Sequence, residues 1–258
     1  MKKYLDNLRQ YQFLLSELVK KGIKLKYRRS YLGILWSMLE PLLSMVVLTI
    51  VFGTLYGNTD KTFPVYILSG RLLYSFYSSA TKAALKSIRS NAAMIKKVYV
   101  PKYLFPVSKV CSCFVNLVTS FIALVIVIVA TGTKLSWTAL LVFIPVIYVF
   151  VFSLGMGLML SALVVTFRDL QHLYGILITA WMYMTPIFYP VDMLPEWVAD
   201  LVRLNPLANF IEMFRDVILY NVVPSGILQA KCIVSCVVAL GLGFWIFYKQ
   251  QDTFILKV

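Results

Sequence analysis

Long apolar runs separated by short polar connections make up most of this chain. A helix needs about 20 apolar residues to cross a bilayer. The pattern predicts six such helices, over residues 32–56, 63–81, 103–130, 137–165, 173–189 and 227–248. We therefore expect an all-α membrane protein with six transmembrane helices, the first five within residues 32–189.

An amphipathic segment precedes the first run. Within residues 11–27 the leucines gather on one helical face, whereas the charged side chains gather on the other. This pattern is typical of a helix that lies on a membrane surface. Glu17 and Lys21 are spaced for an i,i+4 ion pair on its polar face. We expect residues 1–31 to form a cytoplasmic interface helix.

Residues 20–43 mark the point where the chain enters the lipid. Six basic residues are followed by Tyr31 and Trp36, and then by an apolar run. A basic cluster, interfacial aromatics and an apolar segment, in that order, are typical of a cytoplasmic membrane boundary. Glu40 and Pro41 lie inside the apolar run, and a passive anchor would need neither.

Residues 191–227 differ from the rest, because they hold five acidic residues against two basic ones. The stretches 195–203 and 207–220 have helical patterns, but each is too short and too charged to cross a bilayer alone. We expect an extracellular re-entrant helical hairpin here, between the fifth and sixth spans.

Composition agrees with a membrane protein. Hydrophobic residues make up 60% of the 258 positions, and the mean hydropathy is +0.80. A typical soluble domain is about 45–50% apolar. The first apolar run begins near Leu32 without a small-residue cleavage site after it, so we expect no signal peptide. One membrane domain over residues 1–258 accounts for the length.

The net charge of +14 is unevenly distributed. With the N-terminus inside, nineteen basic residues fall in cytoplasmic segments and four on the opposite side. Basic residues collect in cytoplasmic loops beside anionic lipid, so the charge indicates membrane lipid and no nucleic acid as a partner. We expect a multi-pass protein of the cytoplasmic (inner) membrane with both termini in the cytoplasm.

No pattern typical of catalysis is present. The chain lacks both the G-x-x-x-x-G-K-[ST] phosphate loop and the G-x-G-x-x-G motif, and it has a single histidine, His172. Its four cysteines fit apolar packing. We expect no catalytic residue, no metal site and no cofactor in this chain, so that energy for uphill movement comes from another chain.

The segment 82–109 carries seven basic residues and no acidic one. Ser90 or Asn91 would cap a short helix that runs to about Val98, and Pro101 would stop it. A basic cytoplasmic helix is suited to docking on a soluble partner. A lipid-facing basic loop accounts for the charge equally well.

Two ionisable residues fall within predicted spans. Intramembrane charges usually have a function, so Glu40 and Arg71 are candidates. Glu40 would line a pathway or form a structural ion pair. Arg71 would contact an anionic group of a substrate or extend to the outer head groups.

Aromatic residues make up 15% of the chain. Rings with polar tips suit a passage for sugars, since apolar sugar faces stack on rings while hydroxyls form hydrogen bonds. Ordinary membrane-interface belts account for many such residues too. The candidates on the second and fifth spans are Tyr66, Tyr74, Tyr77, Trp181, Tyr183 and Tyr189.

Four segments, in order, resemble permease subunits of ABC-2-type exporters, in the branch that exports O-antigen, capsule or teichoic acid. They are KYRRSYLGILWSMLEPLL (26–43), NAAMIKKVYVPKYLFPVS (91–108), TFRDLQHL (166–173) and the region 185–216. The resemblance implies a transport subunit for a lipid-linked polysaccharide, working as a homodimer with two copies of a separate ATPase subunit. ATP and Mg²⁺ would then bind to that partner.

The resemblance also implies roles for particular residues. Glu40, Arg168 and Asp169 match family positions without an assigned role. The residues expected to contact the ATPase are Asn91, Ile95, Lys96, Lys97, Val98, Pro101, Arg28 and Arg29.

Two alternatives stay open at this point. An exporter of a drug or another lipid would share the architecture, and the neighbouring genes would distinguish it. A membrane enzyme that acts on lipid-linked intermediates would need clustered catalytic residues, which the sequence does not display.

Overall fold

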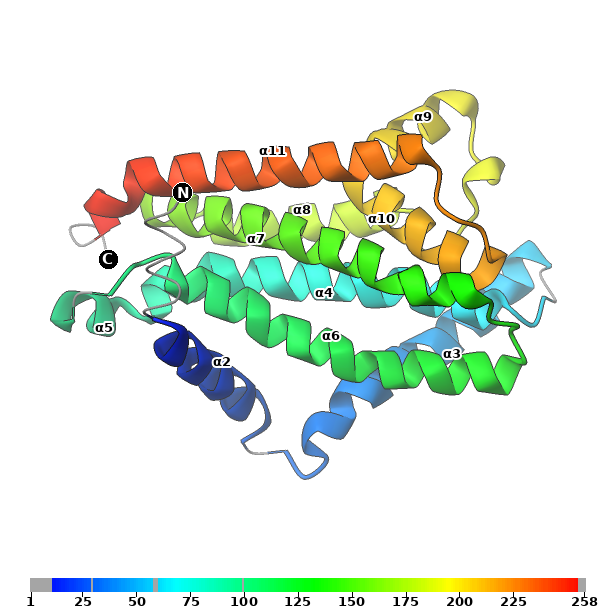
Figure 1. The fold of residues 1–258 in the computed structure, drawn as a ribbon, viewed down its shortest axis with the longest axis horizontal. Helices are drawn as coiled ribbons and strands as arrows, with labels where there is room; N and C mark the ends of the chain where they lie inside the picture. Colours follow the sequence, from blue (N-terminus) through cyan, green and yellow to red (C-terminus); the bar gives the residue numbers. More distant parts are fainter. Residues whose placement is uncertain (1–10, 29, 58–59, 99, 255–258) are drawn as a thin grey trace.

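The computed structural model describes residues 11–28, 30–57, 60–98 and 100–254, and these ranges contain helices and no strand. The long helices run roughly side by side, while α2 lies obliquely beside α6 (Figure 1). The α-helices are α2 (Gln12–Tyr27), α3 (Trp36–Tyr56), α4 (Phe63–Ser90), α5 (Ala92–Lys97), α6 (Leu104–Thr131), α7 (Phe143–Thr166), α8 (Leu170–Met184), α9 (Glu196–Leu204), α10 (Pro206–Arg215) and α11 (Gly226–Gln250). The shorter turns are η1 (Gly33–Leu35), η2 (Trp137–Val142), η3 (Val191–Met193), the π-helical η4 (Asp216–Tyr220) and η5 (Gln251–Thr253).

Four helical segments of the described chain are long and apolar enough to cross a membrane: Gly33–Tyr56, Leu104–Thr131, Trp137–Thr166 and Gly226–Thr253. The all-α, multi-pass membrane character predicted from the sequence is therefore confirmed. Of the two other expected spans, α8 has only 15 residues. Helix α4 is long enough, but it is rich in serine and tyrosine and carries Arg71. The count of six stays a prediction.

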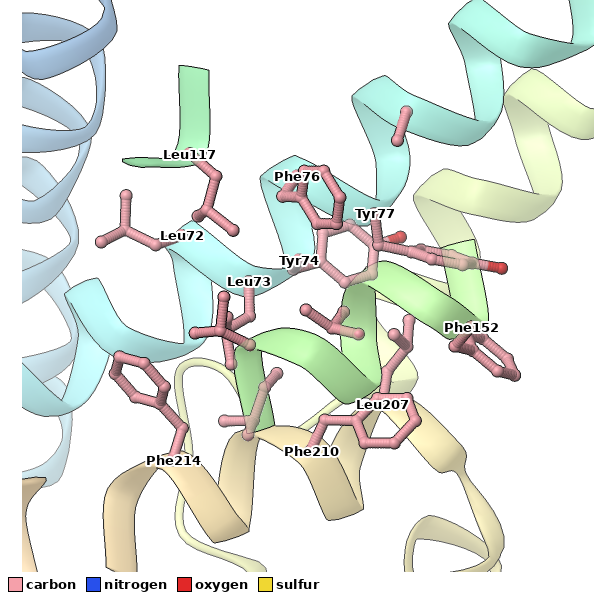
Figure 2. Close-up of a cluster of buried hydrophobic side chains, with 14 of the residues drawn as sticks. Leu72, Leu73, Tyr74, Phe76, Tyr77, Leu117, Phe152, Leu207, Phe210 and Phe214 are labelled. Atoms are coloured by element: carbon pink, nitrogen blue, oxygen red, sulfur yellow. The ribbon is translucent and has the colours of Figure 1, made fainter. Parts of the chain in front are cut away.

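Helix α4 forms the centre of the bundle. It packs against α3, α6, α7, α8 and α10, and 17 of its 28 residues are buried. Neighbouring helices cover the polar side chains Ser69, Thr81 and Ser87, whereas Ser79 and the charged side chains near the end of α4 are exposed. Figure 2 shows part of the resulting core, in which Tyr77 stacks on Phe152 of α7 and Phe152 meets Phe210 of α10, with ring centroids 5.6 and 5.5 Å apart.

Helices α7 and α11 touch through glycines. A Cβ added to Gly243 would lie 2.3 Å from the carbonyl oxygen of Gly155, and one added to Gly155 would lie 2.4 Å from the carbonyl of Ala239. Small residues at such positions let helix backbones approach closely, as they do in membrane helix pairs. This contact fixes the last helix on the bundle.

A second core closes the end of the bundle where α5 lies, called here the α5 end (Figure 1). Phe254, which follows α11, is fully buried and meets Phe247 edge to face at 5.3 Å. The Nζ atom of Lys102 donates a 2.6 Å hydrogen bond to the carbonyl of Gln251. Apolar residues from α2 pack against the same core, so the start of α2, α5 and the chain after α11 form one unit.

The structure differs from the sequence-based predictions at three local features. The second apolar run was expected to end at residue 81, but α4 continues to Ser90, because Ala84, Leu85 and Ile88 remain buried against the bundle. Glu17 pairs with Lys20 at 2.9 Å rather than with Lys21. The helix expected over 207–220 is α10, which widens into the π-helical η4.

Candidate functional site: a polar cavity between the helices

A cavity of about 300 Å³ lies among α3, α4, α6 and α8, beside the end of α2. Its walls are polar although it lies between largely apolar helices. Each of these four helices contributes a side chain with a hydroxyl or amide group. The lining residues that carry such groups are Ser37, Ser44, Ser75, Ser78, Ser79, Asn116, Ser120 and Thr179. The cavity therefore offers hydrogen-bond donors and acceptors in a part of the bundle where lipid would offer none.

Four ionisable side chains line the same cavity: Lys26, Glu40, Arg71 and Lys82. The described residues contain two ion pairs, both on surface helices, and none of these four takes part in one. Arg71 donates to the sulfur of Met182 at 3.1 Å, which is a weak acceptor. Lys26, Glu40 and Lys82 are exposed where they line the cavity, and Arg71 is half-buried. The structure thus brings together Glu40 and Arg71, the two ionisable candidates.

Hydrogen bonds between helices hold the α6 side of this cavity. The hydroxyls of Ser37 and Thr119 lie 2.9 Å apart, and Ser120 donates to the carbonyl of Ser37 at 2.7 Å. Tyr27, at the end of α2, donates to the Asn116 amide oxygen at 3.0 Å. These bonds fasten α2 and the beginning of α3 to α6, so motion of α2 would reach the cavity directly.

Two tyrosines, Tyr74 of α4 and Tyr174 of α8, join α4 to α8 on the other side of the cavity. The Tyr74 hydroxyl donates to the carbonyl of Ile178, and Tyr174 donates to Thr81 at 2.7 Å. Of the six aromatic candidates, Tyr74 lines the cavity and the other five do not. Tyr77 is enclosed in the core, with 1% of its surface exposed. Its role in a pathway stays a prediction.

A second cavity, of about 560 Å³, lies at the opposite end of the bundle from α5 and has a different charge. Four acidic residues and two arginines line it, together with Tyr66 and Tyr220. The charged residues are Asp60, Asp192, Glu212, Asp216, Arg203 and Arg215. Burial, with a smaller contribution from Glu212, raises the pKa of Asp216 to about 6.

Arg215 is the best-connected side chain of this second cavity. Its guanidinium donates to the carbonyls of Pro186 and Ile187 at 2.8 and 3.1 Å and to that of Tyr66 at 3.0 Å. It also lies over the Tyr66 ring, 3.4 Å from the centroid. Burial lowers its pKa to about 10, so it remains charged at neutral pH. Tyr66 in turn donates to the carbonyl of Tyr189 at 2.9 Å, so both residues hold the segment after α8.

The remaining aromatic candidates lie around the end of α8. Trp181 donates to the Asn205 amide oxygen at 3.0 Å, and the same oxygen accepts from the backbone N–H of Leu207, capping α10. Tyr189 donates to the carbonyl of Tyr183 at 2.9 Å, and Tyr183 is exposed. Asn205 therefore ties Trp181 to the start of α10.

The expected coupling residues lie on or beside α5. Asn91 is at the N-cap position, but its side chain donates to the carbonyl of Ser87 at 2.8 Å instead of capping. Ile95 is buried in the second core, whereas Lys96, Lys97 and Val98 are exposed. The helix is thus anchored by one apolar side chain and presents its basic residues outward.

The other expected coupling residues lie outside α5. Pro101 precedes α6 and is half-buried, and Arg28 is exposed beside Lys26 in a shallow depression at the end of α2. Arg29 lies outside the described residues. Within the described chain, no group of three or more His, Cys, Asp or Glu side chains is placed to hold a metal ion, and the four cysteines are free thiols.

Sequence reasoning missed two side chains that line the cavities, Lys82 and Arg215. Lys82 was counted with the following loop because it ends an apolar run, yet it projects into the cavity one turn beyond Ser78 and Ser79. Arg215 was counted among the four basic residues on the side opposite the cytoplasm, and its partners are carbonyls that no sequence pattern marks. For Lys82, the continuing helical period of buried residues through Ile88 was the available signal.

Comparison with known proteins gives consistent matches. The profile of the ABC-2 type transporter family matches residues 14–219. The chain is 30% identical over 250 residues to the O-antigen export system permease protein RfbA of Myxococcus xanthus, covering 96% of both chains. It is 22% identical to the polysialic acid transport protein KpsM of Escherichia coli, covering 91% of this chain and 92% of that protein. It is 23% identical to the capsule polysaccharide export inner-membrane protein CtrC of Neisseria meningitidis serogroup B, covering 81% and 82%.

Proposed function

Because this chain belongs to the ABC-2 type transporter family, we propose that it is the permease subunit of an ATP-driven exporter of a lipid-linked polysaccharide. The four motifs that resembled this family lie within or at the edge of the matched region, and the resemblance is confirmed. The cargo is inferred from relatives whose names specify O-antigen, polysialic acid and capsule polysaccharide. The observation that carries the proposal is this family match together with the polar cavity inside the bundle.

The cavity agrees with sugar cargo in chemical terms. Serine, threonine and asparagine groups line it, and Tyr74 forms part of its wall. Sugar hydroxyls exchange hydrogen bonds with water for hydrogen bonds with such groups at small net cost, whereas a hydrophobic drug would leave them without partners. A lipid-linked glycan therefore fits this lining better than an apolar drug does.

In this proposal the chain crosses the membrane six times, and both of its termini lie in the cytoplasm. Helix α4 crosses as a core helix with buried polar groups such as Ser69 and Thr81, and α8 crosses with the extended segment after it. Helices α9 and α10 lie near the end of the bundle opposite α5, as a re-entrant hairpin would (Figure 1). The α5 end then faces the cytoplasm, as the excess of basic residues there favours.

A homodimer with two ATPase subunits completes the exporter. ATP and Mg²⁺ bind to the ATPase, and this chain contributes the path. Helix α5 presents Lys96 and Lys97 toward that partner while Ile95 anchors it in the second core. Helix α2 shares this core and reaches the cavity through Tyr27. A push on the α5 end would thus move both elements together.

Deletion of the gene tests the cargo. The expected result is loss of one surface polysaccharide and accumulation of its lipid-linked form on the inner face of the membrane. A plasmid copy of the gene should restore export. Unchanged surface polysaccharide with new sensitivity to drugs would contradict the proposal and favour a drug exporter.

A further inference from the structure

The second cavity contains negative charge that the protein does not neutralise. Four carboxylates and two guanidinium groups line it. Of the two arginines, Arg203 is paired at 3.1 Å with Asp200, which does not line the cavity, while Arg215 donates to backbone carbonyls. Three of the carboxylates form no ion pair within the described part of the chain, and these belong to Asp192, Glu212 and Asp216. A ligand that carries hydrogen-bond donors and no negative charge would therefore be attracted to this cavity.

Aromatic rings form another part of the wall. Tyr66 and Tyr220 both line the cavity, and Tyr220 has 59% of its surface exposed. The next residue, Asn221, ends η4 in the left-handed conformation, with a φ of 54°. Its amide group donates to the carbonyl of Lys134 at 3.1 Å and accepts from the backbone N–H of Ser136 at 2.9 Å. These bonds hold the end of η4 in place, so the exposed Tyr220 ring has a fixed position at the edge of the cavity.

Arg215 leaves one hydrogen-bond donor unused. The residue is buried, with 4% of its surface exposed, and its Nε atom has no hydrogen-bond partner among the described residues. A buried donor without an acceptor is unfavourable, and an oxygen atom of a ligand in the cavity would supply that acceptor. The cavity therefore combines carboxylate acceptors, a guanidinium donor and an aromatic ring at its edge.

A sugar offers the groups that match this lining. Its hydroxyls donate to carboxylates, its oxygens accept from N–H groups, and its apolar ring faces stack on aromatic side chains. The cavity volume of about 560 Å³ lies within the range of small-molecule sites, about 300–1,000 Å³, so a short sugar segment fits into it. An inorganic cation does not match, because no group of three or more His, Cys, Asp or Glu side chains in the described chain is placed to hold a metal ion.

From these observations we propose that the second cavity binds a short segment of the exported glycan and discriminates against acidic sugars, an inference that rests on the proposed function. The three unpaired carboxylates accept hydrogen bonds from sugar hydroxyls or pair with the ammonium group of an amino sugar, and the Tyr220 ring stacks against a sugar face. A sugar that carries a carboxylate, sulfate or phosphate would bring like charges together, which weakens binding. The cargo of this permease is therefore a glycan built from neutral or amino sugars.

Binding of defined oligosaccharides to the purified permease tests this selectivity without transport. Neutral maltotriose, cationic triglucosamine and anionic trigalacturonate are titrated into protein in a detergent without a sugar head group, and affinity is measured by calorimetry. Maltotriose and triglucosamine should each bind at least tenfold more tightly than trigalacturonate. Equal affinity for all three, or binding of none, would overturn the inference. Binding of triglucosamine alone would also overturn it, because the cavity would then attract a cation without recognising a sugar.

Charge variants locate the site. The double variant Glu212→Gln/Asp216→Asn should remove the discrimination, so that trigalacturonate binds within about threefold of maltotriose. Asp192→Asn changes an exposed carboxylate and should shift the ratio of the two affinities in the same direction. Glu196→Gln is the matched control, because Glu196 is exposed on α9 and does not line the cavity. Unchanged selectivity in the carboxylate variants, once an unchanged elution profile shows that they are folded, would overturn the inference.

The aromatic contact has its own variants. Tyr220→Ala should weaken the binding of maltotriose by about fivefold or more, whereas Tyr220→Phe keeps the ring and should retain the affinity. Because the Tyr220 side chain is exposed, neither change should affect folding. Equal affinity of the two variants for maltotriose would show that the ring does not contact the sugar.

The composition of the cargo separates the inference from the proposed function. The polysaccharide that is lost on gene deletion should contain neutral or amino sugars and no uronic or sialic acid. If the deletion abolishes export of a polymer rich in acidic sugars, the selective sugar site is wrong and the exporter stands. If the deletion leaves every surface polysaccharide intact, the proposed function fails whatever the probes bind.

Discussion

The guanidinium of Arg215 lies 3.4 Å from the centroid of the Tyr66 ring while it donates to the backbone carbonyl of the same tyrosine. Two further bonds go to Pro186 and Ile187. One side chain from α10 therefore joins α4 to the extended segment that follows α8. If α8 moves during transport, this junction is where the movement is resisted.

Replacement of Arg215 by alanine should lower the free energy of unfolding by several kcal/mol. Two buried carbonyls and one partly buried carbonyl would lose their donor, and the loss of a partner at a buried group costs about 1–3 kcal/mol. Thermal unfolding in detergent measures the effect. Arg203→Ala is the control, since Arg203 forms an exposed pair with Asp200 at 3.1 Å, and such surface pairs contribute about 0–1 kcal/mol. Equal melting temperatures for the two variants would contradict this account.

The close contact between α7 and α11 should make the effect of a glycine-to-alanine change on stability depend on its position in α11. Gly243→Ala should destabilise the protein, because the new methyl group would meet the Gly155 carbonyl at 2.3 Å. Gly241→Ala, two residues away on α11, meets open space and should be neutral or slightly stabilising, since alanine favours helix by up to about 1 kcal/mol. Melting temperatures of both variants check this. A similar loss in both would mean that helix packing is not the cause.

Asp216 predicts a pH dependence. Its pKa is about 6 in the folded protein and 3.8 in the reference state. The folded state therefore holds this proton more tightly, so the contribution of Asp216 to stability is full below about pH 4 and is lost as the pH rises through about 6. Asp216→Asn should flatten that part of the melting-temperature profile. Glu196→Gln, on an exposed face of α9, should leave the profile unchanged.

The Asp216→Asn variant separates the effect of Asp216 from that of the other acidic residues in the second cavity. Three other acidic residues, Asp60, Asp192 and Glu212, line the same cavity. The difference between wild type and Asp216→Asn isolates the single group. Superimposable profiles for wild type and variant would show that Asp216 has an ordinary pKa.

Charge reversal on α5 should weaken the coupling between the permease and the ATPase without unfolding the permease. Lys96→Glu/Lys97→Glu reverses two exposed charges, so the ATPase should lose stimulation by substrate while the melting temperature of the permease stays the same. The control Lys134→Glu reverses an exposed charge in the loop between α6 and α7, at the opposite end of the bundle. Full stimulation in the α5 variant would place the contact with the ATPase elsewhere.

Much of the fold follows from apolar runs, whereas the site depends on contacts that a run does not reveal. The amphipathic pattern located α2 within a residue, and the acidic region contained the two expected short helices. Glu40 and Arg71 stood out because charges in lipid are expensive. Lys82 did not, since a lysine at the end of an apolar run is the normal sign of a membrane boundary. Arg215 bonds to carbonyls far apart in the chain, and only the folded backbone places these together.

The central claim is that this chain moves a lipid-linked glycan with energy from a separate ATPase. The direct measurement is transport in proteoliposomes that contain the permease and the ATPase subunit that copurifies with it. The glycan is placed in one leaflet, and its transfer is followed by access to a soluble lectin. We predict transfer that requires ATP, the permease and the ATPase together. Transfer by the permease alone, or none with all three present and ATP being hydrolysed, would contradict the account.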